Sequence, residues 1–224
     1  VPEGYNIYQV AQLVETAGFG SADRFIAEVT EADLIRSLDI TAETLEGYLF
    51  PDTYFFPKNA DSRAVAIAMV KRFNEVFSPQ WRARTDELGY SIHQVVTLAS
   101  IIEKETGAAH ERELISSVFH NRLKKGMRLE ADPTVIYGVK EFDGNLTRKH
   151  LRTPTPYNTY IIKGLPPGPI ANPGKAALDA ALFPADTKFL FFVARRDTTH
   201  QFSTNLKDHQ AAVRKYQLRR KNRQ

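Results

Sequence analysis

The sequence VVTLASIIEKETG at Val95–Gly107 is the most apolar helical pattern of the chain's middle part, and the predicted core is built around it. Its apolar residues recur with the spacing of one face of an α-helix, and Gly107 is a residue type that stops helices. Ser91 is a residue type that caps helix N-termini. The sequence therefore predicts a core helix over residues 91–106.

The same helix carries the strongest candidate for chemistry. At ~100° per residue, Glu103 lies ~60°, Glu105 ~100° and Lys104 ~160° from the centre of the apolar face. A carboxyl group against an apolar wall has a raised pKa and can donate its proton near neutral pH. We therefore predict Glu103 as a general acid/base. The competing interpretation is a boundary residue paired with Arg112 or Arg122.

The sequence gives little support for a two-carboxylate glycosidase, a metal site or a phosphate-binding loop. A conventional glycosidase needs two carboxylates, and none of Glu46, Asp52, Glu111, Glu130 and Asp132 is clearly a second one, which points to a substrate that supplies its own nucleophile. The chain has no cysteine and six scattered histidines, without an H-E-x-x-H motif or a glycine-rich phosphate loop. We expect no metal and no cofactor.

Aromatic and amide side chains suggest sugar binding. Two segments, Tyr48–Phe56 (YLFPDTYFF) and Tyr157–Tyr160, offer flat apolar faces that stack on pyranose rings. Asn121 and Asn158 offer amides for hydroxyl and acetamido groups. The alternative is that the aromatic residues fill a core and the asparagines form turns.

The order of patterns predicts an α+β fold with a helical core. Leu45–Pro57 should be extended, part strand and part turn, and not helical. Asp132 should cap a short helix and Asn205 the final helix. Further helices are expected near Ile7–Val14, at Ala22–Val29, Ser62–Phe77 and Glu111–Lys125, and from Asn172-Pro173 to Leu182, with strands at Lys188–Ala194 and His200–Ser203.

Composition bounds the class of protein. The chain has 224 residues, 42% hydrophobic and 25% charged, which is typical of a globular protein. Its net charge of +4 comes from Arg219, Arg220, Lys221 and Arg223, because the remainder carries 26 basic and 26 acidic residues. Nucleic-acid binding through that basic tail is therefore a weaker hypothesis. The chain starts at Val1 without methionine, so we expect it to be part of a longer protein.

Several ordered blocks, together running from about Leu45 to Tyr216, resemble the endolytic murein transglycosylase family, also called YceG-like. The opening VPEGYNIYQVAQLV resembles the end of the LysM-like subdomain that precedes the catalytic domain in this family. The blocks are EGYLFPDTY (46–54), ASIIEKET (99–106), SVFHNRL (117–123), DPTVIYG (132–138), TPYNTY (155–160) and GLPPGPIANPG (164–174).

The resemblance implies a lysozyme-like helical core with small β elements at residues 45–224, after a LysM-like remnant at 1–44. It implies non-hydrolytic cleavage of the β-1,4 bond between N-acetylmuramic acid and N-acetylglucosamine, leaving 1,6-anhydro ends. The alternatives are a non-catalytic peptidoglycan-binding module and a lysozyme-type hydrolase. By position the catalytic residue is Glu103, and Pro166–Pro169 would wall the groove. Expected substrate-binding residues are Glu46, Tyr54, Asn121, Asp132, Tyr157, Asn158, Tyr160 and Pro167.

The resemblance also implies partners and a location. The family acts on peptidoglycan glycan strands and is thought to work beside penicillin-binding synthases. Its members are held at the periplasmic face of the inner membrane by one N-terminal helix, which would lie outside this chain. No nucleic-acid partner is implied.

Overall fold

The computed structural model describes residues 1–38, 40–139 and 142–218. They form an α+β fold, as predicted, in which helices alternate with loops and two strands pair. The basic run at Arg219–Arg223 lies outside the described residues. The helices are α1 (Ile7–Thr16), α2 (Ala22–Val29), α3 (Ala32–Ser37), α4 (Ser62–Val76), α5 (Pro79–Glu87), α6 (Ile92–Glu105), η1 (Ala109–Glu111), α7 (Arg112–Lys124), α8 (Asp132–Gly138), α9 (Arg148–Arg152), α10 (Lys175–Leu182), α11 (Leu206–Val213) and η2 (Arg214–Leu218), and the strands are β1 (Phe191–Ala194) and β2 (His200–Ser203).

The chain forms two compact units, and neither is continuous in sequence. Unit 1 comprises Val1–Lys104 and Pro166–Leu182, and unit 2 comprises Glu105–Leu165 and Phe183–Gln224. The chain thus passes from one unit to the other three times. The predicted boundary after residue 44 falls inside unit 1 and stays a prediction about family subdomains.

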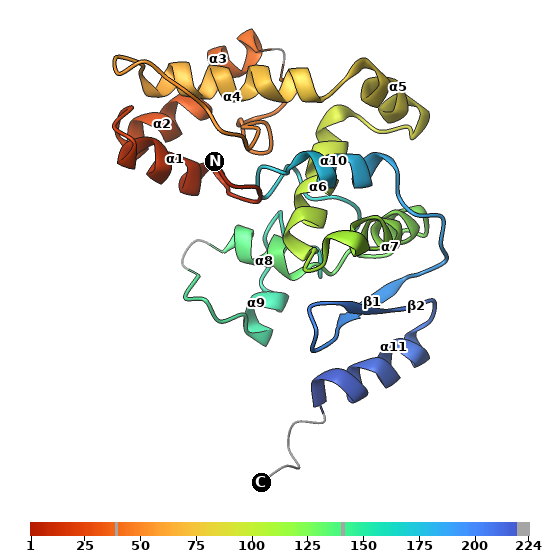
Figure 1. Ribbon diagram of the computed structural model, residues 1–224. Coiled ribbons are helices and arrows are strands. Elements are labelled where there is room, and N and C mark those ends of the chain that lie inside the picture. The colour runs from red at the N-terminus through yellow and green to blue at the C-terminus, as the bar shows by residue number, and fades with distance from the viewer. Residues whose placement is uncertain (39, 140–141, 219–224) are drawn as a thin grey trace. The chain divides into compact units, whose positions relative to one another are not determined.

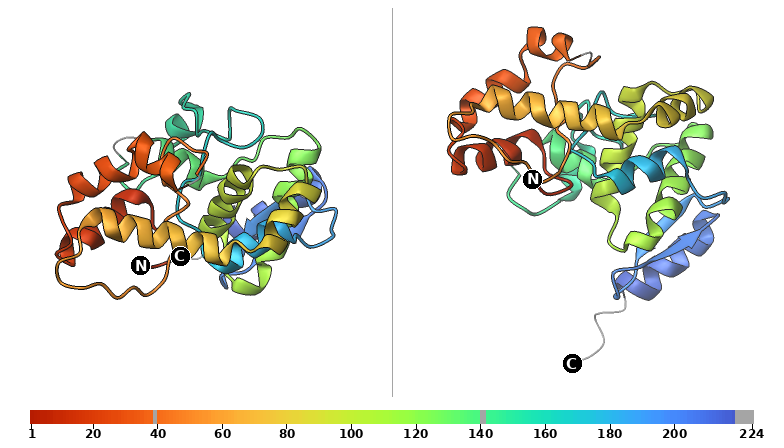
Figure 2. Two further views of the ribbon diagram at one scale, coloured as in Figure 1. Left: turned by 90° about the horizontal axis from the view of Figure 1, so that it is seen from above. Right: turned by 45° about the horizontal axis from the view of Figure 1, so that its top comes forward.

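In unit 1, α1 packs on α2, and α2 packs on the long helix α4, as both views of Figure 2 show. Side-chain oxygens cap each of the three helices: Asn6 accepts from Gln9, Ser21 from Arg24 and Asp61 from Ala64. The predicted bounds of α2 are confirmed, and those of α4 are confirmed to within one residue.

The segment Leu45–Pro57 contains no helix and no strand, and residues 46–48 form a turn. The predicted turn is therefore confirmed, and the predicted strand is wrong. Gly47 has φ +86°, and a Cβ there would lie 2.5 Å from Pro169 Cγ. Asn172 accepts hydrogen bonds from Gly47 N (2.8 Å) and Leu49 N (3.0 Å). Because Asn172 is used in this way, α10 begins only at Lys175, and the predicted start at Asn172-Pro173 is wrong.

Helix α6 confirms the core helix predicted from the opening stretch. Ser91 Oγ accepts from Gln94 N (3.2 Å), which confirms the predicted cap. Every residue from Val95 to Ile102 is buried. Its two buried hydroxyls are satisfied inside the helix, because Thr97 donates to His93 O and Ser100 to Thr97 O. The helix is therefore buried all round rather than along one stripe.

In unit 2, β1 and β2 form an antiparallel hairpin in which Phe191 pairs with Ser203 and Ala194 with His200. The hairpin packs against α7 on one side and α11 on the other (Figure 1). The pairing is confirmed, although β1 is shorter than predicted. Asn205 caps α11 as predicted, through a hydrogen bond from Asp208 N (3.0 Å).

Asp132 does not cap α8, contrary to the prediction. The N-cap position is Ala131, whose side chain offers no hydrogen bond. Asp132 is the first helical residue, and Pro133 follows it. Ala131 O accepts from both the backbone N–H (3.2 Å) and the Oγ1 (2.7 Å) of Thr134, which closes the first turn without a side-chain cap. The carboxylate of Asp132 is thereby left for another partner.

Candidate functional site

Unit 2 contains a cavity of about 470 Å³ with acidic, basic and aromatic walls. The segment that ends α6, the loop into α8, the hairpin and the C-terminal helices all contribute to it. A volume of this size lies in the range of small-ligand sites. Its walls are Glu105, Arg122, Leu129, Glu130, Asp132, Tyr160, Phe192, Val193, Ala194, His200, His209, Val213 and Gln217.

Glu105 lines this cavity with a carboxyl group whose pKa is raised. It is the last residue of α6 and is partly buried. Burial raises its pKa from 4.5 to about 7, and repulsion from the charge of Asp132 acts in the same direction. The negative end of the α6 dipole also disfavours the carboxylate. Glu105 can therefore hold and release a proton near neutral pH.

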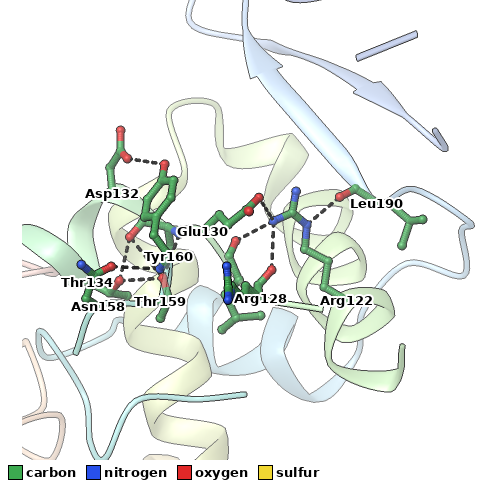
Figure 3. Close-up of polar contacts among 11 residues, drawn as sticks. Arg122, Arg128, Glu130, Asp132, Thr134, Asn158, Thr159, Tyr160 and Leu190 are labelled. Carbon is green, nitrogen blue, oxygen red and sulfur yellow. Dashed lines mark hydrogen bonds and ion pairs between the residues drawn. The ribbon is translucent and has the colours of Figure 1, made fainter. Parts of the chain in front are cut away.

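Asp132 and Tyr160 form a second polar element of the site (Figure 3). Tyr160 Oη donates to Asp132 Oδ1 over 2.6 Å. Burial raises the pKa of Tyr160, and the bond to Asp132 raises it further, so the phenol keeps its proton. The cavity thus brings two of the predicted substrate-binding residues, Asp132 and Tyr160, to the same walls as Glu105.

Arg122 joins the segment before α8 to the entry of the hairpin through the hydrogen bonds of its guanidinium group. Its guanidinium donates to Leu190 O (2.7 Å), Arg128 O (3.1 Å) and Leu129 O (2.9 Å), and to Glu130 Oε2 (3.0 Å), as Figure 3 shows. Glu130 has φ +52°, a left-handed conformation that is uncommon outside glycine. Its partners hold that conformation in place, because Arg122 binds the side chain and Thr159 O accepts from the backbone N–H (3.2 Å).

Two histidines complete the walls. His200 is bound to the carboxylate of Glu111 through Nδ1 (2.8 Å), and both residues are buried. His209 stacks on Phe191 at 5.1 Å, and burial, assisted by the charge of Arg122, lowers its pKa. Sequence inspection found these histidines only as scattered residues, because their partners lie far away along the chain.

Glu103, the predicted acid/base, is not a wall of this cavity. Its Oε2 accepts a hydrogen bond from Gly174 N (3.1 Å), within unit 1. The helical-face prediction assumed that the apolar stripe of α6 marks the side of the site. Residues 95–102 of α6 are buried on all sides, so the stripe does not mark the side of the site. Glu103 and Glu105 are both half-buried, and it is Glu105 that lines the cavity.

Two other predicted residues in unit 2, Asn158 and Asn121, use their amides within the protein. Asn158 is fully buried, donates to His150, Leu151 and Thr153 carbonyls, and accepts from Tyr160 N (3.0 Å). It therefore positions the backbone of Tyr160. Asn121 donates to the carbonyls of Thr187 (2.9 Å) and Phe189 (3.0 Å), which lead into the hairpin.

Tyr157 lies with its ring centroid 4.9 Å from that of Tyr137, outside the cavity walls. Its predicted role in substrate binding stays a prediction.

The predicted site residues of unit 1 are engaged in local structure. Glu46 is 2% exposed and accepts from Ile7 N (3.1 Å) and Asn172 Nδ2 (3.1 Å). Tyr54 donates to Phe50 O (2.6 Å), and Pro167 O accepts from His93 Nε2 (2.9 Å). Their roles in substrate binding stay predictions.

Among the described residues, no cluster of three or more histidine, aspartate or glutamate side chains is arranged to hold a metal ion. No helix in the described part of the chain has the length and apolar character of a membrane span.

The comparisons with known proteins agree with one another. The YceG-like family model matches residues 1–215. The endolytic murein transglycosylase of Bacillus subtilis is 35% identical over 96% of this chain and 64% of its own length, and that of Streptococcus pneumoniae is 27% identical over 95% of this chain and 43% of its length. The chain therefore spans less than two thirds of these relatives.

A crystal structure of a YceG-like protein from Listeria monocytogenes superposes with a TM-score of 0.86 at 34% identity, over 94% of this chain and 74% of that one. From the family match over residues 1–215 and these relatives, we conclude that the chain belongs to the YceG-like family.

Proposed function

We propose that this chain cleaves peptidoglycan glycan strands internally, as a lytic transglycosylase, with Glu105 as its acid and base. The observation that carries the proposal is the carboxyl group of Glu105, whose pKa of about 7 belongs to a group in a cavity of about 470 Å³. The relatives named endolytic murein transglycosylase supply the substrate class and the reaction type.

The reaction has two steps that conserve the proton. Glu105 first gives its proton to the glycosidic oxygen, and the bond between that oxygen and muramoyl C1 breaks. The carboxylate then takes the proton of the muramoyl C6 hydroxyl as that oxygen attacks C1. The products are a free 4-hydroxyl on N-acetylglucosamine and a 1,6-anhydro ring. Glu105 ends protonated, ready for another turnover.

Asp132 and Tyr160 support both steps. The charge of Asp132 favours the protonated form of Glu105 before the first step. The same charge stabilises the positive character that develops at C1 when the glycosidic bond breaks. The 2.6 Å bond from Tyr160 fixes the carboxylate in advance, so little reorganisation is required during the reaction.

A lysozyme-type hydrolase is the second candidate, and the presence of Asp132 in the same cavity favours it. Two carboxylates could act as an acid and a nucleophile, or as an acid and a base for water. Such an enzyme would produce reducing ends in place of anhydro ends. The identity of the product therefore separates the two reactions.

The test is digestion of purified peptidoglycan followed by mass spectrometry of the fragments. We expect 1,6-anhydro ends from the wild type, no cleavage by Glu105→Gln, and cleavage by the matched variant Glu103→Gln. Reducing ends would establish hydrolysis. If Glu103→Gln lost activity and Glu105→Gln kept it, Glu103 would be the catalytic acid and base. No cleavage by any form of the chain would favour a binding module.

The finer expectations from the resemblance are proposals of the same kind. They are a lysozyme-like catalytic core, a LysM-like remnant at residues 1–44, and an inner-membrane anchor on the periplasmic side. Association with penicillin-binding synthases belongs with them.

A further inference from the structure

A buried pair in unit 2, Glu111 and His200, has no part in the reaction described above. Glu111 is 6% and His200 9% exposed. The carboxylate accepts from His200 Nδ1 (2.8 Å), and both its oxygens lie 3.0 Å from the backbone nitrogen of His200. One carboxylate therefore holds both the ring and the backbone of a single histidine.

The hydrogen bonds define which nitrogen carries the proton in the neutral imidazole ring. A carboxylate accepts hydrogen bonds, so Nδ1 carries a proton, and in the neutral ring Nε2 then has a lone pair. His200 lines the cavity that contains Glu105. Among the described residues, the hydrogen bonds of the His200 ring involve Nδ1 and not Nε2. The ring thus has one nitrogen fixed by protein and one available to a bound molecule.

The position of the ring is fixed from two further sides. Phe192 meets it edge-on, with centroids 5.3 Å apart at 90°. Gly107, two residues after Glu105, lies so close to the hairpin turn that a Cβ there would be 2.9 Å from Thr198 O and 4.0 Å from His200 Cε1. The histidine is therefore packed against the segment that follows Glu105.

We infer that His200 is a positioning residue of this site: held by Glu111, its Nε2 accepts a hydrogen bond from a hydroxyl group of the glycan bound beside Glu105. The inference rests on the proposed function. The competing explanation is that the pair only stabilises the hairpin. A buried hydrogen-bonded pair is poor evidence for a purely stabilising role, because replacing both partners by apolar groups of the same shape can be nearly neutral. His200 lines the cavity, and in the described part of the chain its ring is hydrogen-bonded through Nδ1 and not Nε2, which favours the positioning role.

Two substitutions of His200 separate the explanations. Asparagine places its amide near the position of Nδ1 and can still donate to Glu111, whereas glutamine reaches the position of Nε2 and offers its oxygen to the cavity. If Nε2 binds substrate, His200→Asn should lose roughly tenfold or more in kcat/KM, and His200→Gln should retain more activity than His200→Asn. The reverse order, with thermal stability following activity, would overturn the inference.

A substitution of Glu111 tests the tautomer directly. In Glu111→Gln, the side-chain oxygen can accept from the backbone of His200 while its NH₂ group donates to Nδ1, so the proton moves to Nε2. Nitrogen-15 NMR of labelled histidine should show this change, and kcat should fall because the acceptor has become a donor. The matched control is Glu113→Gln, an exposed residue nearby on α7 that removes one negative charge without touching His200.

The readouts distinguish failure of the inference from failure of the proposed function. If the wild type releases no anhydro fragments, the proposed function fails first. If the wild type is active and Glu111→Gln has flipped the tautomer, yet cleaves as fast as Glu113→Gln, the positioning role is wrong and the function stands. A wild-type ring protonated on Nε2 alone would also refute the role.

Discussion

At the scale of single residues, the pKa of Glu105 predicts how cleavage depends on pH. The first step needs the protonated carboxyl group, and its pKa is about 7. We expect kcat/KM to fall about tenfold per pH unit once the pH rises above that value. The measurement is a pH profile of fragment release between pH 5 and 9. A rate that is constant up to pH 9 would contradict an acid with this pKa.

The same group predicts a dependence of stability on pH. The pKa of Glu105 is raised in the folded protein from an ordinary value of 4.5, so the folded state holds this proton more tightly than the unfolded state. The free energy of unfolding should therefore fall as the pH rises from 4.5 to 7, by up to about 3 kcal/mol. Glu105→Gln should remove this fall, so that the variant is more stable than wild type at pH 8 and similar at pH 4. Urea unfolding at both pH values checks it.

Asp132 should tune the pKa of Glu105 through its charge. Asp132→Asn keeps an oxygen that accepts from Tyr160 but removes the negative charge. We expect the pKa of Glu105 to fall and the alkaline limb of the pH profile to move to lower pH. Tyr160→Phe is the control, because it leaves the charge and removes the hydrogen bond. An unchanged limb in Asp132→Asn would show that burial alone sets the pKa.

At the scale of elements, Arg122 joins α7, the loop before α8 and the entry to β1. Arg122→Lys replaces a planar fork by one ammonium group, which cannot reach three carbonyls and a carboxylate together. Buried carbonyls left without donors should cost about 2–3 kcal/mol of unfolding free energy. Urea unfolding measures the loss, and Arg128→Lys, an exposed neighbour, should cost little. Equal stability of both variants would show that water replaces the guanidinium.

Local signals predicted the elements that such signals control. Periodic apolar residues and side-chain caps located α2, α4, α6 and α11. Three helices, α3, α5 and α9, were missed, although Ser78 and Pro79 form a cap and first-turn pair that could have revealed α5. Strand β1 was overestimated because apolar residues before Phe191 pack without pairing in a ladder.

The site was predictable only in part, and the reason is distance along the chain. The ASIIEKET block indicated the end of α6 that reaches the cavity, but the choice between Glu103 and Glu105 depended on neighbours that periodicity does not reveal. Asp132 reaches Tyr160 because Ala131, not Asp132, occupies the cap position. Glu111 and His200 bind each other although 89 residues separate them along the chain. A local sequence pattern cannot predict such a pair.

At the scale of the whole molecule, unit 1 depends on a segment that arrives late in the sequence. Asn172 is fully buried and hydrogen-bonded to Gly47, Leu49, Tyr5 and Glu46. We expect a fragment of residues 1–104 to lack a cooperative unfolding transition, since those groups lose their partner. Circular dichroism of the fragment during heating tests this, and adding a 166–182 peptide should restore the transition. A fragment that melts cooperatively by itself would contradict the dependence.

The interleaving of the two units also sets an order of events during translation. When Lys104 leaves the ribosome, the asparagine that completes its unit has not been made, and all of residues 105–165 must be synthesised first. At ~5–20 residues per second this interval lasts several seconds. Throughout that time the nascent chain exposes the apolar surface of α6, so this protein should depend on holding chaperones more than one whose domains are continuous in sequence.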